Sequence, residues 1–411
     1  MSRVPTRNAV FVAPFFLETT LRFVESAASL EGVRLALVSQ DPLERLPRGL
    51  RHALAAYRRV ADGMDPQQLT SAVRSIGGEI GPIHKLIGAL EQLQEPLGEV
   101  REALAIEGMD RVTARGFRDK SLMKDILRKA GIPCARHALA HDAEEALRRA
   151  PDVGFPMVVK PPDGAGARNT LKLDGRDDLL AYLKQTPPRA EQPLLMEEFI
   201  TGREHSFDAI SIKGRAVWHS LTHYFPAPLE VMENPWIQWC VLLPREVDHP
   251  RYDDIRRAAA GALDALGMDT GLSHMEWFRR RDGSLAISEV GARPPGAQFT
   301  TLMSYAHDVD FYKAWARLMI FDTFDPPRRA FAAGAAFIRG QGQGRVQAIH
   351  GLEKAQRELG ELVVEARLPK KGQSPSSSYE GDGYVILRHP KTEVVEKALE
   401  RLVTLIRVEL G

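Results

Sequence analysis

One short segment constrains the fold more than any other: residues 273–293, SHMEWFRRRDGSLAISEVGAR, in which Asp282-Gly283 separates two runs of strand character. Asp-Gly between such runs is a strong signal for a tight β-hairpin. If the pair forms a two-residue loop, Glu276 on the first strand faces Glu289 on the second. Facing side chains of an antiparallel pair lie about 4.5–5.5 Å apart at Cβ, so the hairpin predicts two adjacent carboxylates.

Like charges at this separation destabilise a sheet, so the two glutamates need compensation. A shared proton, basic neighbours or a divalent cation would each supply it, and carboxylate oxygens suit a Mg²⁺ ion that also binds phosphate. Because side chains alternate along a strand, Arg293 extends the face that carries Glu289 and Gly291. The alternative is an exposed hairpin whose two glutamates are solvated.

The composition excludes several classes of partner. The chain has 411 residues, 44% of them hydrophobic, which is enough for two or three domains with large cores. Lys and Arg total 55 against 54 Asp and Glu, so we expect no broad field for nucleic acid or an anionic membrane. No apolar stretch approaches the roughly 18 residues that suggest a membrane span. Any charged ligand must therefore be held by local groups.

The cysteines and the first residues bear on the compartment. Cys134 and Cys240 lie far apart and outside any metal-binding spacing, which suits a reducing, cytoplasmic environment. The segment MSRVPTRNAVFVAPFFLE resembles a signal peptide only faintly, because Pro14 interrupts its apolar run and no cleavage site follows. We interpret it as a first buried strand. The oligomeric state stays open, with a homodimer as the common default.

Two parts of the chain differ in their pattern. Residues 1–105 alternate strand-like and helical segments, which predicts a small α/β domain with a parallel sheet. Its first strand lacks the G-x-G-x-x-G turn, so a dinucleotide site is not expected there. From about 106 the pattern changes, and FRDKSLMKDILRKAG is typical of a helix ended by Gly131. A helix near 142–150 and a strand, PMVVKP, follow.

Residues 194–244 divide into strands and a loop. Strand-like runs fill 194–224, and Lys213-Gly214 joins the last two as a two-residue hairpin turn. Residues 225–244 hold four prolines and two tryptophans without a clean period, which predicts a long loop carrying aromatic groups. Such a loop either serves the function or packs only on itself.

The last third of the sequence predicts helices and a small terminal unit. Helical patterns occupy about 251–266 and 309–320, and FDPPRRA suggests a linker. Residues 330–411 then read as strand, helix, strand, strand, helix, which is typical of a small α+β unit.

Two further segments carry possible ligand groups. Lys160 ends an apolar strand and precedes PPDGAGARNTLKL, whose Gly164 and Gly166 let backbone N–H groups approach phosphate oxygens. This is not a Walker A motif, because G-K-[ST] is missing, and a flexible connection is the alternative.

The second segment is LLMEEFITGREHSFD. Residues Glu197 to Ile200 would form an edge whose backbone pairs with an adenine, while Phe199 and Ile200 cover the ring. Glu204 begins the next strand and would accept ribose hydroxyls. The alternative is a strand and turn with solvated acids.

The order of these pieces resembles the ATP-grasp superfamily: a basic residue near 120, a strand-ending lysine before a glycine loop, E-E-F-I-x-x-x-E, and two hairpin glutamates followed by arginine. The resemblance covers about 106–322. It is greatest to the carboxylate–amine ligase branch, including the bacterial L-amino acid ligases, which also tend to carry H-x-E on the first hairpin strand and A-R-x-x-G after the second.

The resemblance implies an α/β and α+β fold with the ATP-grasp architecture. The expected domains are a Rossmann-like domain at 1–105, an ATP-grasp domain at 106–325 with lobes at 106–192 and 193–325, and a C-terminal α+β lid-type subdomain at 330–411.

The resemblance also assigns roles by position. The residues implied to contact ATP are Lys120 and Lys160 at the phosphates, the 164–168 loop with Gly164 and Gly166 above them, and Glu197, Phe199, Ile200 and Glu204 at the nucleoside. Glu276 and Glu289 would bind Mg²⁺, for which Mn²⁺ is a possible substitute. Arg293 would face the transferred phosphate or the acyl intermediate. Lys124 is an alternative to Lys120, because the two lie four residues apart on one helix.

One position departs from the family pattern. ATP-grasp enzymes usually have E-x-N on the second hairpin strand, where the Asn gives a further metal oxygen, whereas Gly291 stands at that place here. The number of ions, one or two, is therefore open. The hairpin pairing puts His274 opposite Gly291, where it would act as a metal ligand or contact the substrate. A buried, hydrogen-bonded histidine is the alternative.

The resemblance implies an ATP-dependent ligase that joins a small carboxylate to an amine, of the amino-acid or dipeptide type, through an acyl phosphate. Arg293, Lys160 and His274 are the expected catalytic residues. One alternative is an ATP-grasp carboxylase that activates bicarbonate, but so small a substrate needs no apolar cover from Trp236 and Trp239. The other is a nucleotide-binding regulatory module without turnover.

Overall fold

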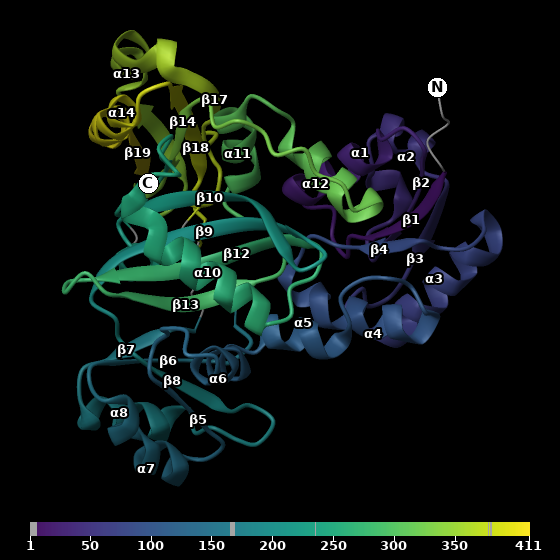
Figure 1. Ribbon diagram of the computed structural model, residues 1–411. Helices are drawn as coiled ribbons and strands as arrows, with labels where there is room; N and C mark the ends of the chain where they lie inside the picture. The colour runs from purple at the N-terminus through teal and green to yellow at the C-terminus, as the bar shows by residue number, and fades with distance from the viewer. Residues whose placement is uncertain (1–5, 165–168, 235, 377, 379) are drawn as a thin grey trace.

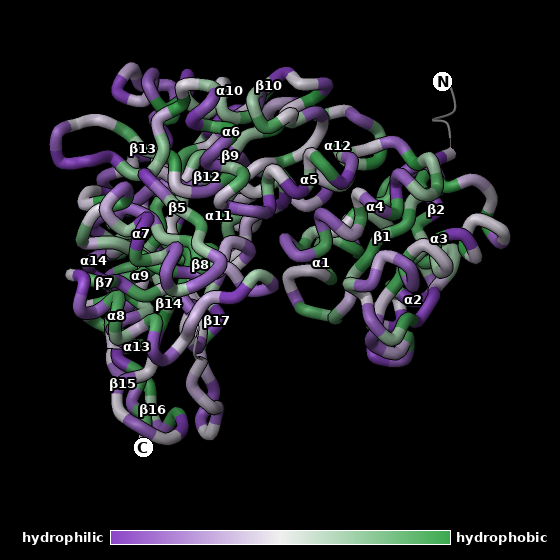
Figure 2. Tube along the Cα trace, turned by 90° about the horizontal axis from the view of Figure 1, so that it is seen from below, coloured by the Kyte–Doolittle hydropathy of each residue, from purple (hydrophilic) through white to green (hydrophobic). Residues whose placement is uncertain are grey.

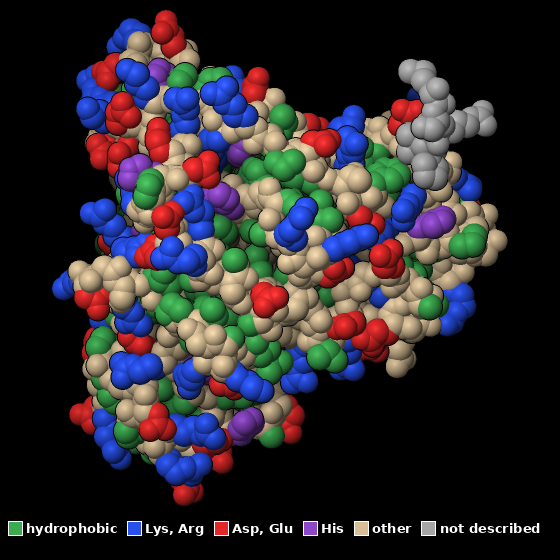
Figure 3. Space-filling model, viewed as in Figure 1, with side chains coloured by type: hydrophobic (Ala, Val, Ile, Leu, Met, Phe, Trp, Pro, Cys, Tyr) green, Lys and Arg blue, Asp and Glu red, His purple; other side chains and the backbone are tan. Residues whose placement is uncertain are grey.

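The computed structural model describes residues 6–164, 169–234, 236–376, 378 and 380–411. Figure 1 shows an N-terminal unit at the right, a large central sheet, a smaller sheet below it and the C-terminal helices at the upper left. Side chains of both charges are interspersed over the face seen in Figure 3, in keeping with the net charge of +1. Within the described residues, no helix is both long and apolar enough for a membrane span.

The N-terminal unit is built on a parallel sheet of order β3-β2-β1-β4, so the predicted parallel sheet is confirmed. Its strands are β1 (Arg7–Val12), β2 (Val33–Ser39), β3 (Ala56–Arg59) and β4 (Lys85–Ile87). Its helices are α1 (Glu18–Ala28), α2 (Arg48–Ala53), α3 (Pro66–Ile80) and α4 (Gln94–Leu104). Val10 and Val12 pack in one core and Phe11 in another, as expected of a parallel sheet covered on both faces. Figure 2 shows this unit to one side of the rest of the molecule.

Two helices, not one, connect the N-terminal unit to the rest. The predicted helix ended by Gly131 is confirmed as α6 (Lys120–Lys129), but it begins later than expected, because a separate helix, α5 (Arg111–Arg118), precedes it and the two meet at Asp119. The Asp119 carboxylate accepts hydrogen bonds from the N–H groups of Ser121 and Leu122 and so caps α6. Lys120 therefore lies at the first residue of α6. The chain leaves this helix at Gly131, which has a φ of +72°, as expected of a glycine stop.

The smaller sheet has the order β5-β8-β6-β7 and is antiparallel. Its strands are β5 (His137–Ala140), β6 (Met157–Lys160), β7 (Leu171–Leu173) and β8 (Leu194–Glu198). The helices α7 (Ala143–Val153) and α8 (Arg176–Gln185) pack on one face through a core that includes Val153, Val159 and Leu179. The opposite face is left for the cavity described below.

The central sheet has eight strands in the order β13-β12-β9-β10-β11-β14-β18-β17, all antiparallel. They are β9 (Gly202–Ile212), β10 (Arg215–Phe225), β11 (Trp239–Leu243), β12 (Gly271–Arg280), β13 (Leu285–Gly291), β14 (Ala332–Ile338), β17 (Val363–Arg367) and β18 (Gly383–His389). The two-residue turn at Lys213-Gly214 is confirmed, because Arg215 pairs with Ile212 and the turn residues have φ of 49° and 74°.

Helices cover the central sheet on both faces. On one face α10 (Asp253–Ala265) packs through Ile255 and Leu263. On the other face, α11 (Phe299–His307) and α12 (Phe311–Phe321) share a core with the N-terminal unit, where Phe23 meets Trp315 at a ring distance of 4.8 Å. Helix α1 is thus packed against the central part of the molecule, as Figure 1 shows.

The C-terminal residues contribute to two sheets. Strands β14, β17 and β18 belong to the central sheet, while β15 (Gly340–Gly342), β16 (Val346–His350) and β19 (Arg407–Leu410) form a three-stranded sheet. The helices are α13 (Leu352–Leu359) and α14 (Thr392–Leu405). The expected boundary at 325–330 falls between α12 and β14, but the central sheet continues across it.

The predicted long loop at 225–244 is wrong, because a short helix and a buried strand occupy most of it. Residues Pro228–Glu233 form α9, and Trp239–Leu243 form the buried strand β11 between β10 and β14. All five residues of β11 are buried, as they must be inside a sheet covered on both faces. The run of apolar residues after Trp239 marks this strand, and the flanking prolines obscured it.

Candidate functional site

A cavity of about 500 Å³ lies between the smaller sheet and the central sheet. Its walls contain most of the described residues that the sequence analysis proposed for the site, but not Lys124 or Trp236. These residues are Lys120, Lys160, Gly164, Glu197, Phe199, Ile200, Glu204, His274, Glu276, Glu289 and Arg293. Gly166 and the rest of 165–168 lie outside the described residues. Segments spread over more than 170 residues of sequence thus meet around one space of the size of a small-ligand site.

The hairpin pairs the two glutamates as predicted. Glu276 faces Glu289, and His274 faces Gly291. The predicted two-residue loop is wrong, however. The N–H of Arg280 donates to the carbonyl oxygen of Ser284 at 2.8 Å, which leaves a three-residue loop, 281–283, with Gly283 at a φ of +85°.

A bulge on the second strand restores the predicted register. The pairing shifts between Glu276 and Trp277, because Trp277 faces Ile287 and Ser288 is the additional residue. The extra residue in the loop and the extra residue in the bulge compensate each other. The bulge therefore brings Glu289 back opposite Glu276, which a regular hairpin with this loop would not do.

The two facing carboxylates have basic neighbours. Glu289 Oε1 lies 3.0 Å from Lys120 Nζ, which also donates to the carbonyl oxygen of Gly164 at 2.5 Å. Glu276 Oε1 lies 3.9 Å from His274 Nε2. Burial opposes ionisation of Glu276, but the nearby His274 outweighs it and lowers the pKa of this carboxyl. Glu276 is thus available as an anionic oxygen donor, and Glu289 presents its carboxyl group beside it with Lys120 as its partner.

Glu204 differs from these two carboxyls. It lies on β9 opposite Phe278 of β12, next to the pair formed by Ser206 and Glu276. Burial raises its pKa well above the usual value, and the charges of Glu276 and Glu289 act in the same direction. Glu204 is therefore the carboxyl of the cavity that most readily holds a proton, and it can donate as well as accept hydrogen bonds.

Two lysines share the carboxylate of Glu197. Lys124 Nζ lies 2.6 Å from Glu197 Oε1 and Lys160 Nζ lies 2.8 Å from Glu197 Oε2. Burial opposes ionisation of Glu197, but both ammonium groups outweigh it and lower its pKa to about 2. Glu197 lies inside β8 and its backbone faces both β5 and β6. The Glu197 side chain therefore holds the ammonium groups of Lys124 and Lys160 in place.

The two candidate lysines on α6 have different surroundings. Lys124 is fully buried, and its Nζ also donates to the carbonyl oxygen of Ser288 at 2.6 Å, which ties α6 to the hairpin bulge. Burial lowers the pKa of Lys124 in spite of Glu197. Lys120 lines the cavity and contacts Glu289 instead. Lys120 is thus the one of the two that faces the ligand space.

Phe199 and Ile200 follow the end of β8 and form an apolar slot. The N–H of Phe199 donates to the carbonyl oxygen of Pro156 at 3.1 Å, and Lys172 Nζ lies 5.0 Å from the centre of the Phe199 ring. Ile200 packs with Ala135 and Ala286 next to Phe278. Flat apolar groups at this end of the cavity suit a planar ring.

Arg293 is held by a residue that the sequence analysis missed. Its NH2 lies 2.7 Å from Glu91 Oε2, and the other oxygen of Glu91 lies 2.9 Å from Arg118 NH1. Glu91 is in the short helix Glu91–Leu93 of the N-terminal unit and is 7% exposed. Burial opposes its ionisation, but Arg293 and Lys120 lower its pKa. No local motif marks Glu91, because its partners are distant in sequence.

His274 is held by a second residue that was not assigned a role. Asp208 Oδ1 lies 2.7 Å from His274 Nδ1, and the two residues face each other across β9 and β12. Burial opposes the charged imidazole, but the fully buried Asp208 outweighs it and raises the pKa of His274 to about 9. A protonated imidazole has no lone pair for a metal, which favours the substrate contact over the metal ligand. Alternation along a strand puts Asp208 on the same face as Glu204, which is the signal in the sequence that could have found it.

The far end of the cavity is aromatic. Phe299 lies 5.6 Å from the ring of His274, 6.0 Å from Tyr224 and 6.4 Å from Trp239. Leu229 and the exposed Glu230 of α9 complete this wall. Trp239 thus lines the cavity, as suspected, whereas Trp236 is 60% exposed and is not among the lining residues. We call the end at Phe199 and Ile200 the nucleotide end, after the adenine that the sequence analysis expects there, and the end at Phe299 the acyl end, after the substrate proposed for it below.

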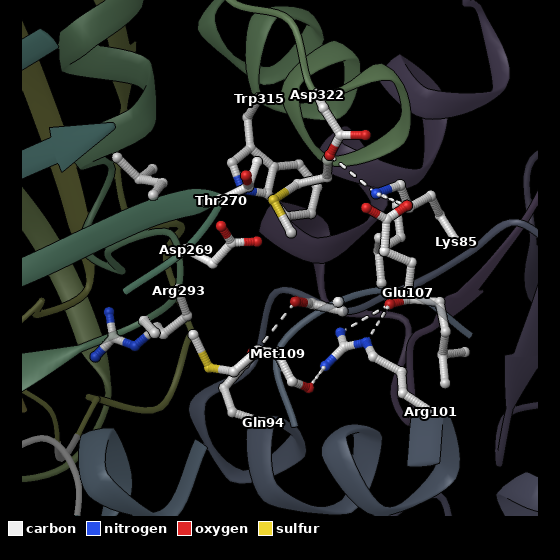
Figure 4. A pocket seen from close by; sticks show the side chains of 18 of the residues that line it. Lys85, Gln94, Arg101, Glu107, Met109, Asp269, Thr270, Arg293, Trp315 and Asp322 are labelled. Carbon is white, nitrogen blue, oxygen red and sulfur yellow. Dashed lines mark hydrogen bonds and ion pairs between the residues drawn. The ribbon is translucent and has the colours of Figure 1, made fainter. Parts of the chain in front are cut away.

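A second, much smaller cavity of about 50 Å³ lies between the N-terminal unit and the central sheet. Figure 4 shows Lys85 bound to Asp322 and Arg101 bound to backbone carbonyl oxygens, while the guanidinium of Arg293 turns away from both. The space suffices for a few water molecules. Its two most buried cations, Lys85 and Arg101, are already paired, and the space is too small for a ligand larger than water.

The fold and the site show the features of one class of protein. Lysines and a facing pair of carboxylates line a cavity between two antiparallel sheets. Residues 125–307 match the family model of the ATP-grasp domain. This part of the chain is an ATP-grasp domain, and the expected ATP-grasp architecture is confirmed.

Individual relatives point the same way. An L-arginine-specific L-amino acid ligase of Bacillus subtilis is 24% identical over 252 residues, which cover 59% of this chain and 59% of that protein. The chain thus matches less than two-thirds of that relative's length. The crystal structure of an L-amino acid ligase from Bacillus licheniformis aligns with a TM-score of 0.79 at 20% identity, over 99% of this chain and 100% of that one.

A carboxylase also has this fold. The biotin carboxylase domain dimer of the 2-oxoglutarate carboxylase from Hydrogenobacter thermophilus, solved with MgADP, ADP and bicarbonate, aligns with a TM-score of 0.67 at 17% identity. The alignment covers 97% of this chain and 90% of that one. At these identities the solved structures establish the fold, and the reaction has to be argued from the site.

Proposed function

We propose that the protein is an ATP-dependent ligase that joins a carboxylate to an amine, of the amino-acid or dipeptide type, and releases ADP and phosphate. The observation that carries the proposal is that one cavity of about 500 Å³ joins a charged nucleotide end to an aromatic acyl end. A bicarbonate ion would leave such an aromatic chamber unused, whereas an organic acid fills it. The match to the ATP-grasp family model and the likeness to L-amino acid ligases support the proposal.

The nucleotide is proposed to lie between the two sheets. Phe199 and Ile200 cover the adenine, and Glu204 binds the ribose hydroxyls. Lys120 and Lys160 contact the phosphates, together with the backbone at Gly164. We prefer Lys120 to Lys124 for this role, because Lys124 is fully buried against Glu197.

Glu276 and Glu289 are proposed to hold Mg²⁺, with Mn²⁺ as a possible substitute. Their hard oxygen atoms, facing each other and lining the cavity, fit this ion. Two carboxylates do not fill an octahedral shell, so phosphate oxygens and water would complete it. When bound, the ion neutralises phosphoryl oxygens and orients the triphosphate. Gly291 gives no side-chain oxygen, so we propose one tightly held ion.

The chain's own residues then account for the chemistry. A substrate carboxylate at the acyl end attacks the γ-phosphate, and the ammonium groups of Lys120 and Lys160 offset the charge that gathers there. The product is an acyl phosphate, whose acyl carbon the amine attacks as phosphate leaves. Arg293, held by Glu91, faces the oxygen that becomes negative in this second step. His274, held charged by Asp208, adds a second cation at the same wall.

The proposed partners are small molecules only, and a cytoplasmic location and a homodimer remain our expectations. The test of the proposal is ADP release over pairs of carboxylic and amino acids with Mg²⁺, followed by mass measurement of the product. We expect release that needs both substrates and a product mass equal to their sum less water.

Two other outcomes would overturn the proposal. Stimulation by bicarbonate without any response to amino acids would indicate a carboxylase. The fold that the chain shares with a biotin carboxylase domain is the argument for this second candidate. Tight ATP binding with background ADP release over the whole panel would make it a nucleotide-binding regulatory module.

A further inference from the structure

The acyl end of the cavity ends in an unusual turn. Gly296, Ala297 and Phe299 line the cavity, and Ala297 and Gln298 have φ of 48° and 61°. Two successive non-glycine residues in the left-handed region cost free energy, so surrounding contacts must hold them. We call residues 296–299 the acyl turn.

We propose that Arg22, in helix α1 of the N-terminal unit, is a positioning residue for the substrate at the acyl end, because it fixes the acyl turn through Thr301 and Gln298. Arg22 does not touch the cavity itself. The inference rests on the proposed function for the identity of the substrate at the acyl end. The contacts that hold the acyl turn do not depend on the reaction.

The hydroxyl of Thr301 is the centre of this connection. It donates to Gln298 Oε1 at 3.0 Å, accepts from Arg22 NH1 at 3.2 Å and lies 2.8 Å from the hydroxyl of Tyr312. A hydroxyl has one proton and two acceptor sites, so Tyr312 is the second donor and Thr301 is fully satisfied. Gln298, Thr301 and Tyr312 are all buried, which makes the loss of one member costly to the others.

The other side of Arg22 is held by the C-terminal strands. Its NH2 lies 3.3 Å from Glu365 Oε1 on β17, and Glu365 also accepts from the hydroxyl of Tyr384 at 2.6 Å and of Tyr305 at 3.0 Å. Glu18 Oε1 lies 3.5 Å from the same NH2. One guanidinium thus joins α1, α11 and β17, which a lysine ammonium cannot do with the same fork geometry.

A residue from the C-terminal region lies beside the acyl turn. Burial raises the pKa of the Glu380 carboxyl group and outweighs the effect of the Ala297 backbone, which lowers it. The turn therefore lies among residues from both ends of the chain, neither of which lies in the family-model match at 125–307. Substrate positioning at the acyl end thus depends on residues that no local motif contains.

The decisive experiment compares Arg22→Met and Thr301→Val with wild type. Both variants remove one member of the connection and leave the nucleotide end untouched. We expect the KM for the organic acid to rise by roughly tenfold or more, because displaced substrate-positioning groups have effects of this size at a distance. The KM for ATP stays within about twofold, as expected of a site more than one contact shell away. The double variant is no worse than the worse single one, because the two residues act through one path.

The matched control is Arg367→Gln. Arg367 pairs with Glu18, so this variant removes another contact between α1 and β17 without touching Thr301. We expect wild-type KM values for it. Equal rises in the KM for acid and for ATP, or the same rise in the control, would overturn the inference.

Amide hydrogen exchange tests the inference without catalysis. We expect faster exchange at residues 297–302 in Arg22→Met and Thr301→Val, measured well below their lowered midpoints of thermal unfolding, and unchanged exchange in the control. Unchanged exchange in the first two variants overturns the positioning role. If wild type shows no acid- and amine-dependent ADP release, the proposed function fails, while the exchange result still decides the role of Arg22. Arg22→Lys, which keeps the charge, covers the case in which Arg22→Met does not fold.

Discussion

The nucleotide end and the acyl end of the cavity are built in different ways. At the nucleotide end, charged residues from neighbouring strands and α6 neutralise one another in close pairs, such as Lys160 with Glu197 and Lys120 with Glu289. At the acyl end, aromatic rings form the wall, and the acyl turn lies among residues from both ends of the chain.

The two ends should therefore differ in the amino-acid substitutions that they tolerate. Exchanging a charge at the nucleotide end leaves a buried partner unpaired, so both folding and chemistry are affected. Exchanging a ring at the acyl end changes packing around a space that has to accept some substrate. We expect the first end to be strict and the second to be adjustable, and the following predictions test this in order of effect size.

The largest effect is expected for Lys124→Met. This change leaves the buried carboxylate of Glu197 with one ammonium instead of two, so the free energy of unfolding should fall by about 3–5 kcal/mol. Lys120→Met should cost no more than about 1 kcal/mol, since its partner Glu289 is partly exposed, but should weaken ATP binding. Urea unfolding and ATP titration measure the two quantities. If Lys124→Met folds normally and loses ATP affinity, the choice of Lys120 as the phosphate contact is wrong.

The next effect is expected for Glu289→Gln in activity. Loss of one anionic oxygen of the metal pair should lower kcat by about 10²–10³-fold, the size seen when one electrostatic group is removed from an active site. The Mg²⁺ concentration for half-maximal rate should rise as well. Glu233→Gln, in the same cavity but on α9, is the control and should keep the Mg²⁺ dependence of wild type. A normal Mg²⁺ response in Glu289→Gln would separate the hairpin from the metal.

A pH-dependent effect of intermediate size is expected at Glu198. Burial opposes its ionisation, but hydrogen bonds from Arg280 and Arg136 lower its pKa to about 2. A depressed pKa in the folded state means that stability is present above the unfolded pKa, near 4.5, and is lost as pH falls toward 2. The free energy of unfolding of wild type should therefore exceed that of Glu198→Gln by about 1.5–3 kcal/mol at pH 7.

The measurement for Glu198 is urea unfolding across this pH range. The difference between wild type and Glu198→Gln should shrink as pH falls from about 4.5 to about 2. Glu353→Gln, an exposed surface change, should show no such convergence. A difference that stays constant with pH would mean that Glu198 acts through packing and not through its charge.

The smallest effect is expected for a matched pair of aromatic changes. Phe299→Leu should raise the KM for the organic acid about fivefold, the equivalent of about 1 kcal/mol of ring contact. Phe278→Leu, near the nucleotide end, should raise the KM for ATP by a similar factor and leave the acid unaffected. A change that affects both substrates equally would remove the division of the cavity into two ends.

The sequence predicted more of the residues at the nucleotide end of the cavity than at the acyl end, and the reason is physical. Strand alternation and a turn signal relate residues that are close in sequence, so Glu276, Glu289 and His274 were placed opposite the right partners. The turn type was wrong, and only the bulge at Ser288 preserved the pairing. A bulge depends on tertiary context and leaves no clear pattern in the residues themselves.

The missed features share long-range contacts. Glu91 meets Arg293 across 202 residues, and Arg22 meets Thr301 across 279 residues. Periodicity carries no information at such separations. The buried strand β11 was taken for a loop, because the prolines on either side outweighed five apolar residues that only the completed sheet explains.

The course of the central sheet has a practical consequence for anyone who shortens this protein. Strand β14 is buried at every residue and lies between β11 and β18, so the region after 325 completes the sheet that carries the hairpin. A protein truncated at residue 325 would keep all the residues that match the ATP-grasp family model, but the edge of strand β11 would have no partner strand. Such an edge recruits other chains, so the truncated protein is expected to precipitate during expression.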